Sequence, residues 1–153
     1  KNKLISQYRC YQQLFVFFKK ASIKNILSIP AIWSVLFPAL FLDLVVTTYQ
    51  AVCFPMYGIP KVLRKEYIVF DRQHLQYLNL IEKMNCIYCS YFVGVLSYIQ
   101  EIAARTEQYW CPIKHKNETN TLHSRYVKFV KYGDAKLYKL NKEKVRNDFK
   151  DIM

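Results

Sequence analysis

The sequence predicts a mainly α-helical, membrane-anchored protein, with an apolar N-terminal segment that spans or re-enters the bilayer and a small helical cytoplasmic domain. Hydrophobic residues make up 52% of the 153 positions, and only 3 are Gly, too few for the turns of an all-β fold. Residues 26–60 contain a single charged side chain, Asp43. The chain has a net charge of +12, and basic residues lie on both sides of this apolar run. Basic residues beside an apolar segment are typical of membrane proteins.

Residues 1–25 are predicted to form a basic amphipathic helix at the membrane interface. Six cations and no acid occur in this range: Lys1, Lys3, Arg9, Lys19, Lys20 and Lys24. Apolar side chains lie among them: Leu14, Phe15, Phe17 and Phe18. Such a helix rests its apolar side on the bilayer, and Lys19, Lys20 and Lys24 are our candidates for binding lipid phosphate. An ordinary solvated helix end is the alternative.

Residues 26–60 form the predicted membrane segment. A straight helix of this length would be about 50 Å long, whereas the hydrocarbon core is about 30 Å thick. The segment must therefore bend, and Pro38 in its middle is the expected place. Two geometries fit: one kinked span over residues 30–54, or a re-entrant hairpin that turns near Pro38.

Asp43 is a possible intramembrane acid, because a carboxylate inside an apolar run needs a partner or a proton. It would contact a proton or a cation, lie at an interfacial helix end, or pair with a neighbouring chain.

Residues 61–153 are predicted to form the helical domain. Asp71 is placed to cap a helix in which Leu75, Leu78 and Ile81 recur at helical spacing. Residues 84–104 are a second apolar stretch, but their Cys, Ser and Tyr content favours a buried or interfacial helix over a span.

The basic tail, residues 114–153, is soluble in character. Tyr126, Val127, Phe129 and Val130 suggest a helix that ends at Gly133. A final charged helix is expected over residues 135–152.

The side chains best suited to bind a metal ion are three thiols and an imidazole. Cys86 and Cys89 are separated by two residues, and Cys111 and His115 by three. Together they would supply a closed four-ligand set suited to tetrahedral Zn²⁺, although iron or an iron–sulfur cluster uses similar ligands. We therefore predict a zinc or iron site at these four residues.

Two alternatives to a metal site remain open. Cys86 and Cys89 would be small buried residues of a helix, as free cysteines often are. Otherwise they form a redox dithiol of a membrane thiol oxidoreductase, with Cys53 or Cys111 as the second partner. The odd count of five cysteines does not suit a secreted disulfide framework and favours thiols that face a reducing cytoplasm.

Arg105 is a further candidate for binding lipid phosphate. Glu101 lies four residues before it, so an ordinary ion pair on a helix surface is the competing interpretation. Tyr109 and Trp110 suit the belt of aromatic rings found at lipid headgroups.

Several segments resemble an uncharacterised family of small bacterial membrane proteins. The likeness is carried by Cys53-Phe54-Pro55, Tyr57-Gly58-Ile59-Pro60, Tyr67 to Arg72, Asn85-Cys86 with Tyr88-Cys89, Glu101 to His115 and His123 to Tyr126. The resemblance implies a bacterial source and a membrane setting. It implies no activity, cofactor or catalytic residue. The expected location is the bacterial inner membrane, with the soluble part in the cytoplasm.

The sequence as a whole suggests a membrane-anchored, metal-binding accessory or electron-transfer subunit of a larger membrane assembly. The thiol oxidoreductase is one alternative. The other is a structural interaction protein that binds anionic lipid and partner chains. Membrane lipids and protein partners are expected, and nucleic acid is disfavoured because the apolar run explains the basic charge better. Whether the chain is an enzyme is left open.

Overall fold

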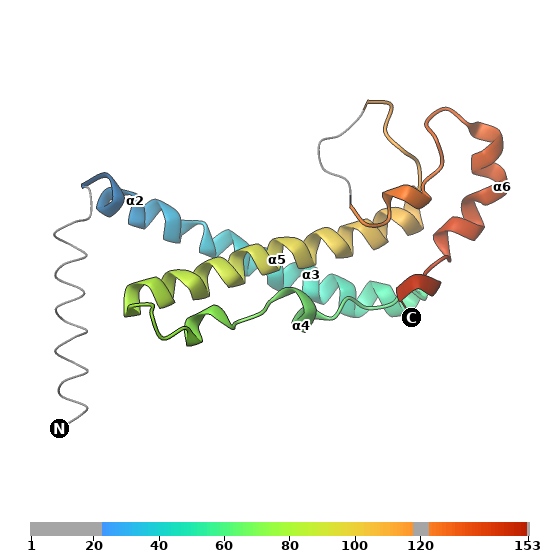
Figure 1. The fold of residues 1–153 in the computed structure, drawn as a ribbon. Helices are drawn as coiled ribbons and strands as arrows, with labels where there is room; N and C mark the ends of the chain where they lie inside the picture. Colours follow the sequence, from blue (N-terminus) through green and yellow to red (C-terminus); the bar gives the residue numbers. More distant parts are fainter. Residues whose placement is uncertain (1–22, 118–122, 153) are drawn as a thin grey trace, which may run out of the picture. The chain divides into compact units, whose positions relative to one another are not determined.

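The computed structural model describes residues 23–117 and 123–152, and these residues are mainly helical (Figure 1), as predicted. The α-helices are α2 (Ile23–Ser34), α3 (Leu36–Tyr57), α4 (Arg64–Tyr67), α5 (Leu80–Trp110) and α6 (Ala135–Arg146). Short 3₁₀ turns are η1 (Arg72–His74), η2 (Tyr126–Lys128) and η3 (Lys150–Ile152). The described residues contain no β-strand, only an isolated parallel bridge between Ile113 and Val130. Lys19, Lys20 and most of the predicted interfacial helix lie outside the described residues.

The chain divides into two compact units. Of the described residues, the first contains those up to Phe41 together with Ile68–Val95, and the second contains Leu42–Tyr67 together with those from Leu96 onward. Helices α3 and α5 each contribute residues to both units.

The predicted membrane segment is a kinked helix rather than a hairpin. Helix α2 ends at Ser34 and α3 begins at Leu36, so the helix is interrupted at one residue. Pro38 explains the interruption, because it has no N–H to donate to the Ser34 carbonyl and its ring crowds that group. The Ala39 N–H still donates to the Val35 carbonyl (3.3 Å), so the chain bends at this point without turning back.

Helix α5 begins later than the sequence suggested. The Asn79 side chain accepts a hydrogen bond from the Glu82 N–H (2.9 Å), and the Glu82 carboxylate accepts one from the Asn79 N–H (2.8 Å). This reciprocal capping box fixes the helix start at Leu80. The helix predicted after Asp71 is wrong, since only the turn η1 follows and the Asp71 side chain makes no capping hydrogen bond.

The tail contains one of its two predicted helices. The helix predicted through Tyr126 and Val130 is wrong, because the chain is extended after the turn η2. There the Val130 N–H donates to the Pro112 carbonyl (2.9 Å), and the Lys114 N–H donates to the Val130 carbonyl (2.8 Å). The final helix, predicted over residues 135–152, is confirmed in part as α6, which ends at Arg146 and is followed by the turn η3. Asp134 caps α6 by accepting from the Leu137 N–H (2.9 Å).

Two helical stretches are long and apolar enough to cross a membrane by length and composition: Leu27–Tyr57 and Leu80–Trp110, each of 31 residues. Only 11% and 22% of their most apolar windows are buried within the protein. For the second stretch the sequence predicts a buried or interfacial helix over residues 84–104. The observed helix α5 is longer than the predicted stretch, and most of its apolar window is not fully buried.

The core of the second unit is small. Its buried apolar side chains are Phe54, Ile59, Val62, Tyr98, Ile102 and Phe149. They come from α3, from the residues that follow it, from α5 and from the C-terminal turn. The core therefore attaches the C-terminal end of the chain to the two long helices.

Candidate membrane interface

The part of α3 in the second unit buries two polar side chains beside Phe54 and exposes several large apolar ones. Asp43, Gln50 and Phe54 are buried, and their spacing of seven and four residues places them on one helix face. On the rest of the helix, Leu44 is 67% and Met56 72% exposed. A helix on the surface of a soluble protein shows the opposite pattern. The polar face of α3 is therefore directed at the protein, and its apolar face at the surroundings.

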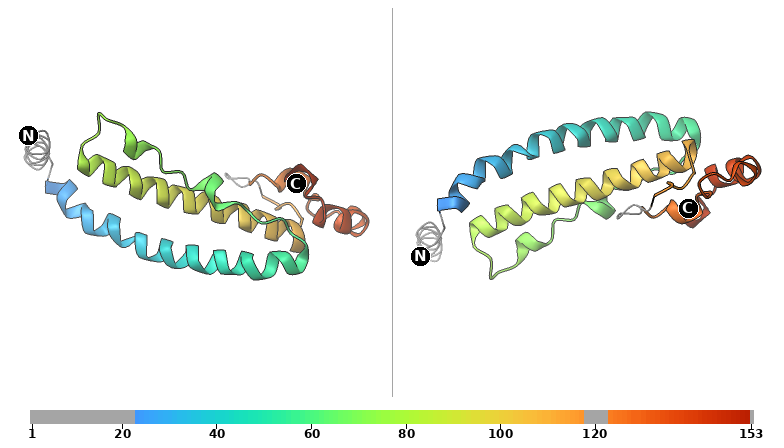
Figure 2. Two further views of the ribbon diagram at one scale, coloured as in Figure 1. Left: turned by 90° about the horizontal axis from the view of Figure 1, so that it is seen from below. Right: turned by 90° about the horizontal axis from the view of Figure 1, so that it is seen from above.

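In the second unit α3 and α5 lie side by side and run in the same direction (Figure 2). The Tyr49 hydroxyl is hydrogen-bonded to the Thr106 hydroxyl (3.1 Å). Further along both helices, the Tyr57 ring contacts Tyr109 (centroids 5.0 Å apart) and Trp110 (5.3 Å). Because α3 and α5 run in the same direction, the chain that connects them must run in the opposite direction before α5 begins.

That connection, residues 58–79, is called the return segment below. Its residues 58–67 belong to the second unit and pack against the polar face of α3. Gln50 binds both backbone groups of Val62: its Oε1 accepts from the Val62 N–H (2.7 Å) and its Nε2 donates to the Val62 carbonyl (3.3 Å). The same Nε2 donates to the Tyr98 hydroxyl (3.0 Å). One buried amide thus replaces the backbone partners that Val62 would have in a strand or helix.

Asp43, the possible intramembrane acid, is paired within its own chain. Arg64 donates to both of its carboxylate oxygens, and the Nη2–Oδ2 distance is 2.7 Å. The Thr47 hydroxyl also donates to this carboxylate (3.3 Å). The Asp43 side chain is buried whereas Arg64 is 45% exposed, so the pair joins the inner face of α3 to the surface of the return segment. A neighbouring chain, one of the predicted partners, is therefore not needed to pair with the Asp43 carboxylate.

Arg105 is held inside the second unit. Its Nε donates to Glu101 (2.9 Å) and its Nη1 donates to the Pro60 carbonyl (2.7 Å). The predicted ion pair with Glu101 is confirmed, but it is buried and not on the helix surface. Both donors are directed into the protein, so this geometry favours a role in holding the return segment over the binding of lipid phosphate.

Ion pairs dock the C-terminal turn. The buried Arg125 donates to Asp151 through Nη1 (2.8 and 2.9 Å), and Lys128 Nζ donates to the same carboxylate (2.7 Å). These hydrogen bonds hold the pKa of the Asp151 carboxyl well below its usual range. Gln108 on α5 donates to the backbone carbonyls of Val145 (2.8 Å) and Asp148 (2.9 Å). The basic tail is therefore part of the second unit and not a loose appendage.

Aromatic rings gather where α3 and α5 end. Tyr57, Tyr109 and Trp110 contact one another there, and the Arg146 guanidinium lies 4.3 Å from the Tyr109 ring centroid. Trp110 is largely exposed. An interfacial belt at Tyr109 and Trp110 stays a prediction, to which the structure adds Tyr57.

The four predicted metal ligands do not form a group. Cys86 and Cys89 lie on α5, Cys111 directly follows it, and every residue from Cys89 to Trp110 is helical, so no loop folds between the two pairs. His115 is exposed, and its ring stacks on Tyr126 (centroids 6.2 Å apart). Over residues 23–117 and 123–152 no three His, Cys, Asp or Glu side chains gather closely enough to hold a metal ion. The zinc or iron site stays a prediction that this geometry does not support.

The cysteine alternatives are not decided either. Cys53, Cys86, Cys89 and Cys111 are all free thiols. Cys86 is half-buried and Cys89 is exposed, so the pair is not fully buried, as the packing alternative required.

Sequence reasoning missed Gln50, whose side chain binds both backbone groups of Val62 in the return segment. Its only signal is a spacing of seven residues from Asp43, which puts both on one helix face. A second missed contact joins His123 Nε2 to the Glu107 carboxylate (2.8 Å).

No family model, curated protein or solved structure matches this chain.

Proposed function

We propose that the chain is a monotopic membrane protein, which enters one leaflet without crossing the bilayer. In the second unit the apolar face of α3 lies in the leaflet, while residues 58–67 and the basic tail stay in water. In the first unit the exposed apolar side chains of α2 and of the beginning of α3 lie in the leaflet. The protein serves as a structural interaction protein for anionic lipid and partner chains. The inverted polarity of α3, with Asp43 and Gln50 inside and leucines outside, is the observation that carries the proposal.

The protein exposes many large apolar side chains, and their exposure to water is unfavourable. In the second unit they include Leu44, Val52 and Met56, and in the first unit Leu27, Phe37 and Phe41. Removing one such side chain from water contributes about 1.5–3 kcal/mol. Six of them together contribute about 9–18 kcal/mol, enough to offset much of the loss of freedom on binding, which is about 4–15 kcal/mol. Large exposed apolar side chains of this kind mark membrane or protein contacts.

The return segment argues against a span. Its residues 58–63 have irregular backbone, and the short helix α4 follows them; Lys61, Arg64, Lys65 and Glu66 in this second-unit part are all exposed. A spanning α3 would bring these charges to membrane depth beside it, and each central Lys or Arg costs about 2.5–3.5 kcal/mol. Irregular backbone exposed to lipid is not tolerated in the hydrocarbon region. A helix lying in the plane of one leaflet avoids both penalties, because the return segment packs on the polar face, opposite the apolar one.

The charge distribution supports an anionic surface as the docking site. Lys24 is exposed at the start of α2, and α6 exposes Lys136, Lys139 and Lys144. Each basic side chain near an anionic leaflet contributes about 1 kcal/mol. The resemblance to small bacterial membrane proteins fits this setting.

Vesicle flotation of the full chain tests the proposal. The protein is expected to float with phosphatidylcholine vesicles, and more tightly when phosphatidylglycerol is included. At about 1 M salt, where the Debye length is about 3 Å, only the gain from phosphatidylglycerol should disappear. Protein that stays at the bottom of the gradient, or that loses all binding in salt, would show that the apolar face is not seated in lipid.

A further inference from the structure

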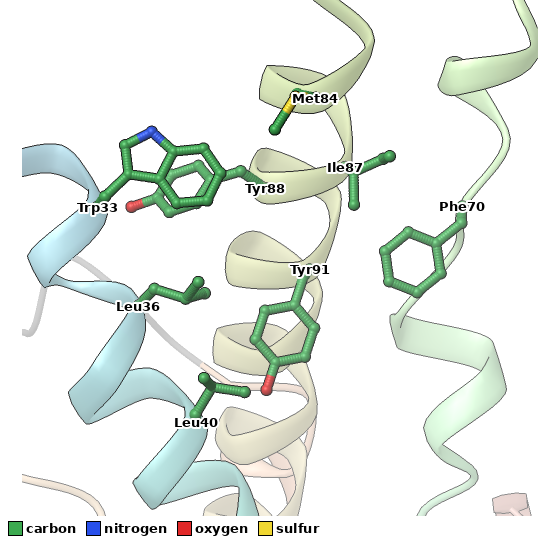
Figure 3. A pocket seen from close by; sticks show the side chains of 8 residues that line it. All are labelled: Trp33, Leu36, Leu40, Phe70, Met84, Ile87, Tyr88 and Tyr91. Atoms are coloured by element: carbon green, nitrogen blue, oxygen red, sulfur yellow. The ribbon is translucent and has the colours of Figure 1, made fainter. Parts of the chain in front are cut away.

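The first unit contains a cavity of about 310 Å³ between α2–α3 and the beginning of α5 (Figure 3). Trp33, Leu36 and Leu40 line it from one helix pair, and Met84 and Ile87 line it from α5. The ring of Phe70, from the return segment, closes a further side. All the lining residues belong to this unit.

The cavity offers a ligand no polar partner. The surface that lines it is entirely apolar. The hydroxyl of Tyr88, a lining residue, donates to the backbone carbonyl of Ile32 (2.8 Å) and is therefore already used. The Tyr88 ring meets Trp33 (centroids 5.3 Å apart) and adds to the apolar wall. A peptide or a polar metabolite would leave its own polar groups unpaired here, whereas a hydrocarbon chain has none.

We propose that this cavity binds one acyl chain of a bilayer lipid. The inference rests on the proposed membrane seat, because some of the lining residues are also part of the exposed apolar surface of the first unit. Leu40, Met84 and Ile87 line the cavity and are also partly exposed, and Phe37 and Phe41 lie beside Leu40 on the outside of α3. The volume is at the lower end of the range for ligand sites, about 300–1,000 Å³, which suits one chain and excludes a whole phospholipid.

Trp33 provides a direct reporter of an acyl chain in the cavity. The chain has two tryptophans, so Trp110→Phe leaves Trp33 as the only indole. The full chain in maltoside micelles is titrated with phosphatidylcholine that carries bromines on one acyl chain, since bromine quenches indole fluorescence on contact. We expect saturable quenching at one equivalent. Leu36→Phe with Leu40→Phe should weaken it about tenfold by filling the cavity.

The matched control is Leu44→Phe with Val52→Phe, the same type of change on exposed positions outside the cavity, which should leave quenching unchanged. Met84→Phe is a second filling variant in case the double change lowers helicity. Quenching that rises linearly with lipid in every variant, or no quenching, would overturn the inference. Quenching by free dibromostearic acid but not by the brominated phosphatidylcholine would also overturn the inference. Flotation of the same proteins separates the two proposals, because intact flotation without saturable quenching rejects only the cavity ligand.

Discussion

Leu44→Asp is expected to weaken binding of the chain to vesicles by about 100-fold. Leu44 is on the exposed face of α3, where our proposal places lipid hydrocarbon. An aspartate at membrane depth costs about 2.5–3.5 kcal/mol, and each 1.4 kcal/mol is a factor of ten in affinity. The folded structure should not change, because the side chain makes no core contact. Flotation over a series of lipid concentrations measures the change.

Leu63→Asp is the matched control for this substitution. Leu63 is also exposed, at 50%, but it lies in the return segment beside Val62 and Arg64. The proposal places that segment in water, so vesicle binding should fall by no more than about twofold, as for an exposed surface change. If both substitutions weaken vesicle binding equally, the exposed face of α3 does not contact lipid more than the return segment does.

Gln50→Leu is expected to release the return segment from α3. Leucine has nearly the same size but cannot bind the N–H and carbonyl of Val62, both of which Gln50 now satisfies. A buried polar group without a partner costs about 1–3 kcal/mol, so two such groups cost several times the thermal energy. Trypsin should then cleave at Lys61, Arg64 and Lys65 roughly 10- to 100-fold faster, since local opening exposes the backbone to the protease.

Gln100→Leu provides the control for this experiment. Gln100 lies on α5 with its side chain exposed, so the same replacement leaves no buried group without a partner. The tryptic cleavage rate within the return segment should match that of the unchanged protein. If Gln50→Leu also leaves that rate unchanged, the amide does not hold the segment, and α3 has some other reason to bury a polar face.

Local features of the fold were predictable because their causes are local. Pro38 interrupts the apolar helix by lacking a donor, and Asp134 starts α6 by accepting from the Leu137 N–H. The extended chain near Val130 was not predictable in the same way. Its apolar residues suit a helix or an extended segment equally, and its hydrogen bonds come from Pro112 and Lys114, which lie outside the pattern.

The candidate site depends on contacts that no local pattern reveals. Gln50 meets Val62, and Arg105 meets Pro60, only because the return segment runs back along α3. The sequence drew attention to Asp43 by its charge but gave no sign of Arg64 as its partner. The cysteine and histidine spacing suggested four converging ligands, yet an unbroken α5 lies between Cys89 and Cys111.

Cysteine labelling in membrane vesicles tests the one-sided arrangement most directly. In a chain whose five cysteines are replaced by serine, Lys24→Cys, Leu63→Cys and Val127→Cys each add one exposed thiol, before α3, in the return segment and in the tail. Right-side-out and inverted vesicles from expressing cells are treated with a maleimide that cannot cross membranes. We expect all three thiols to react in the same vesicle preparation and none in the other. Reaction of Lys24→Cys in one preparation and Val127→Cys in the other would mean that the helix crosses the bilayer, and the one-leaflet proposal would then be wrong.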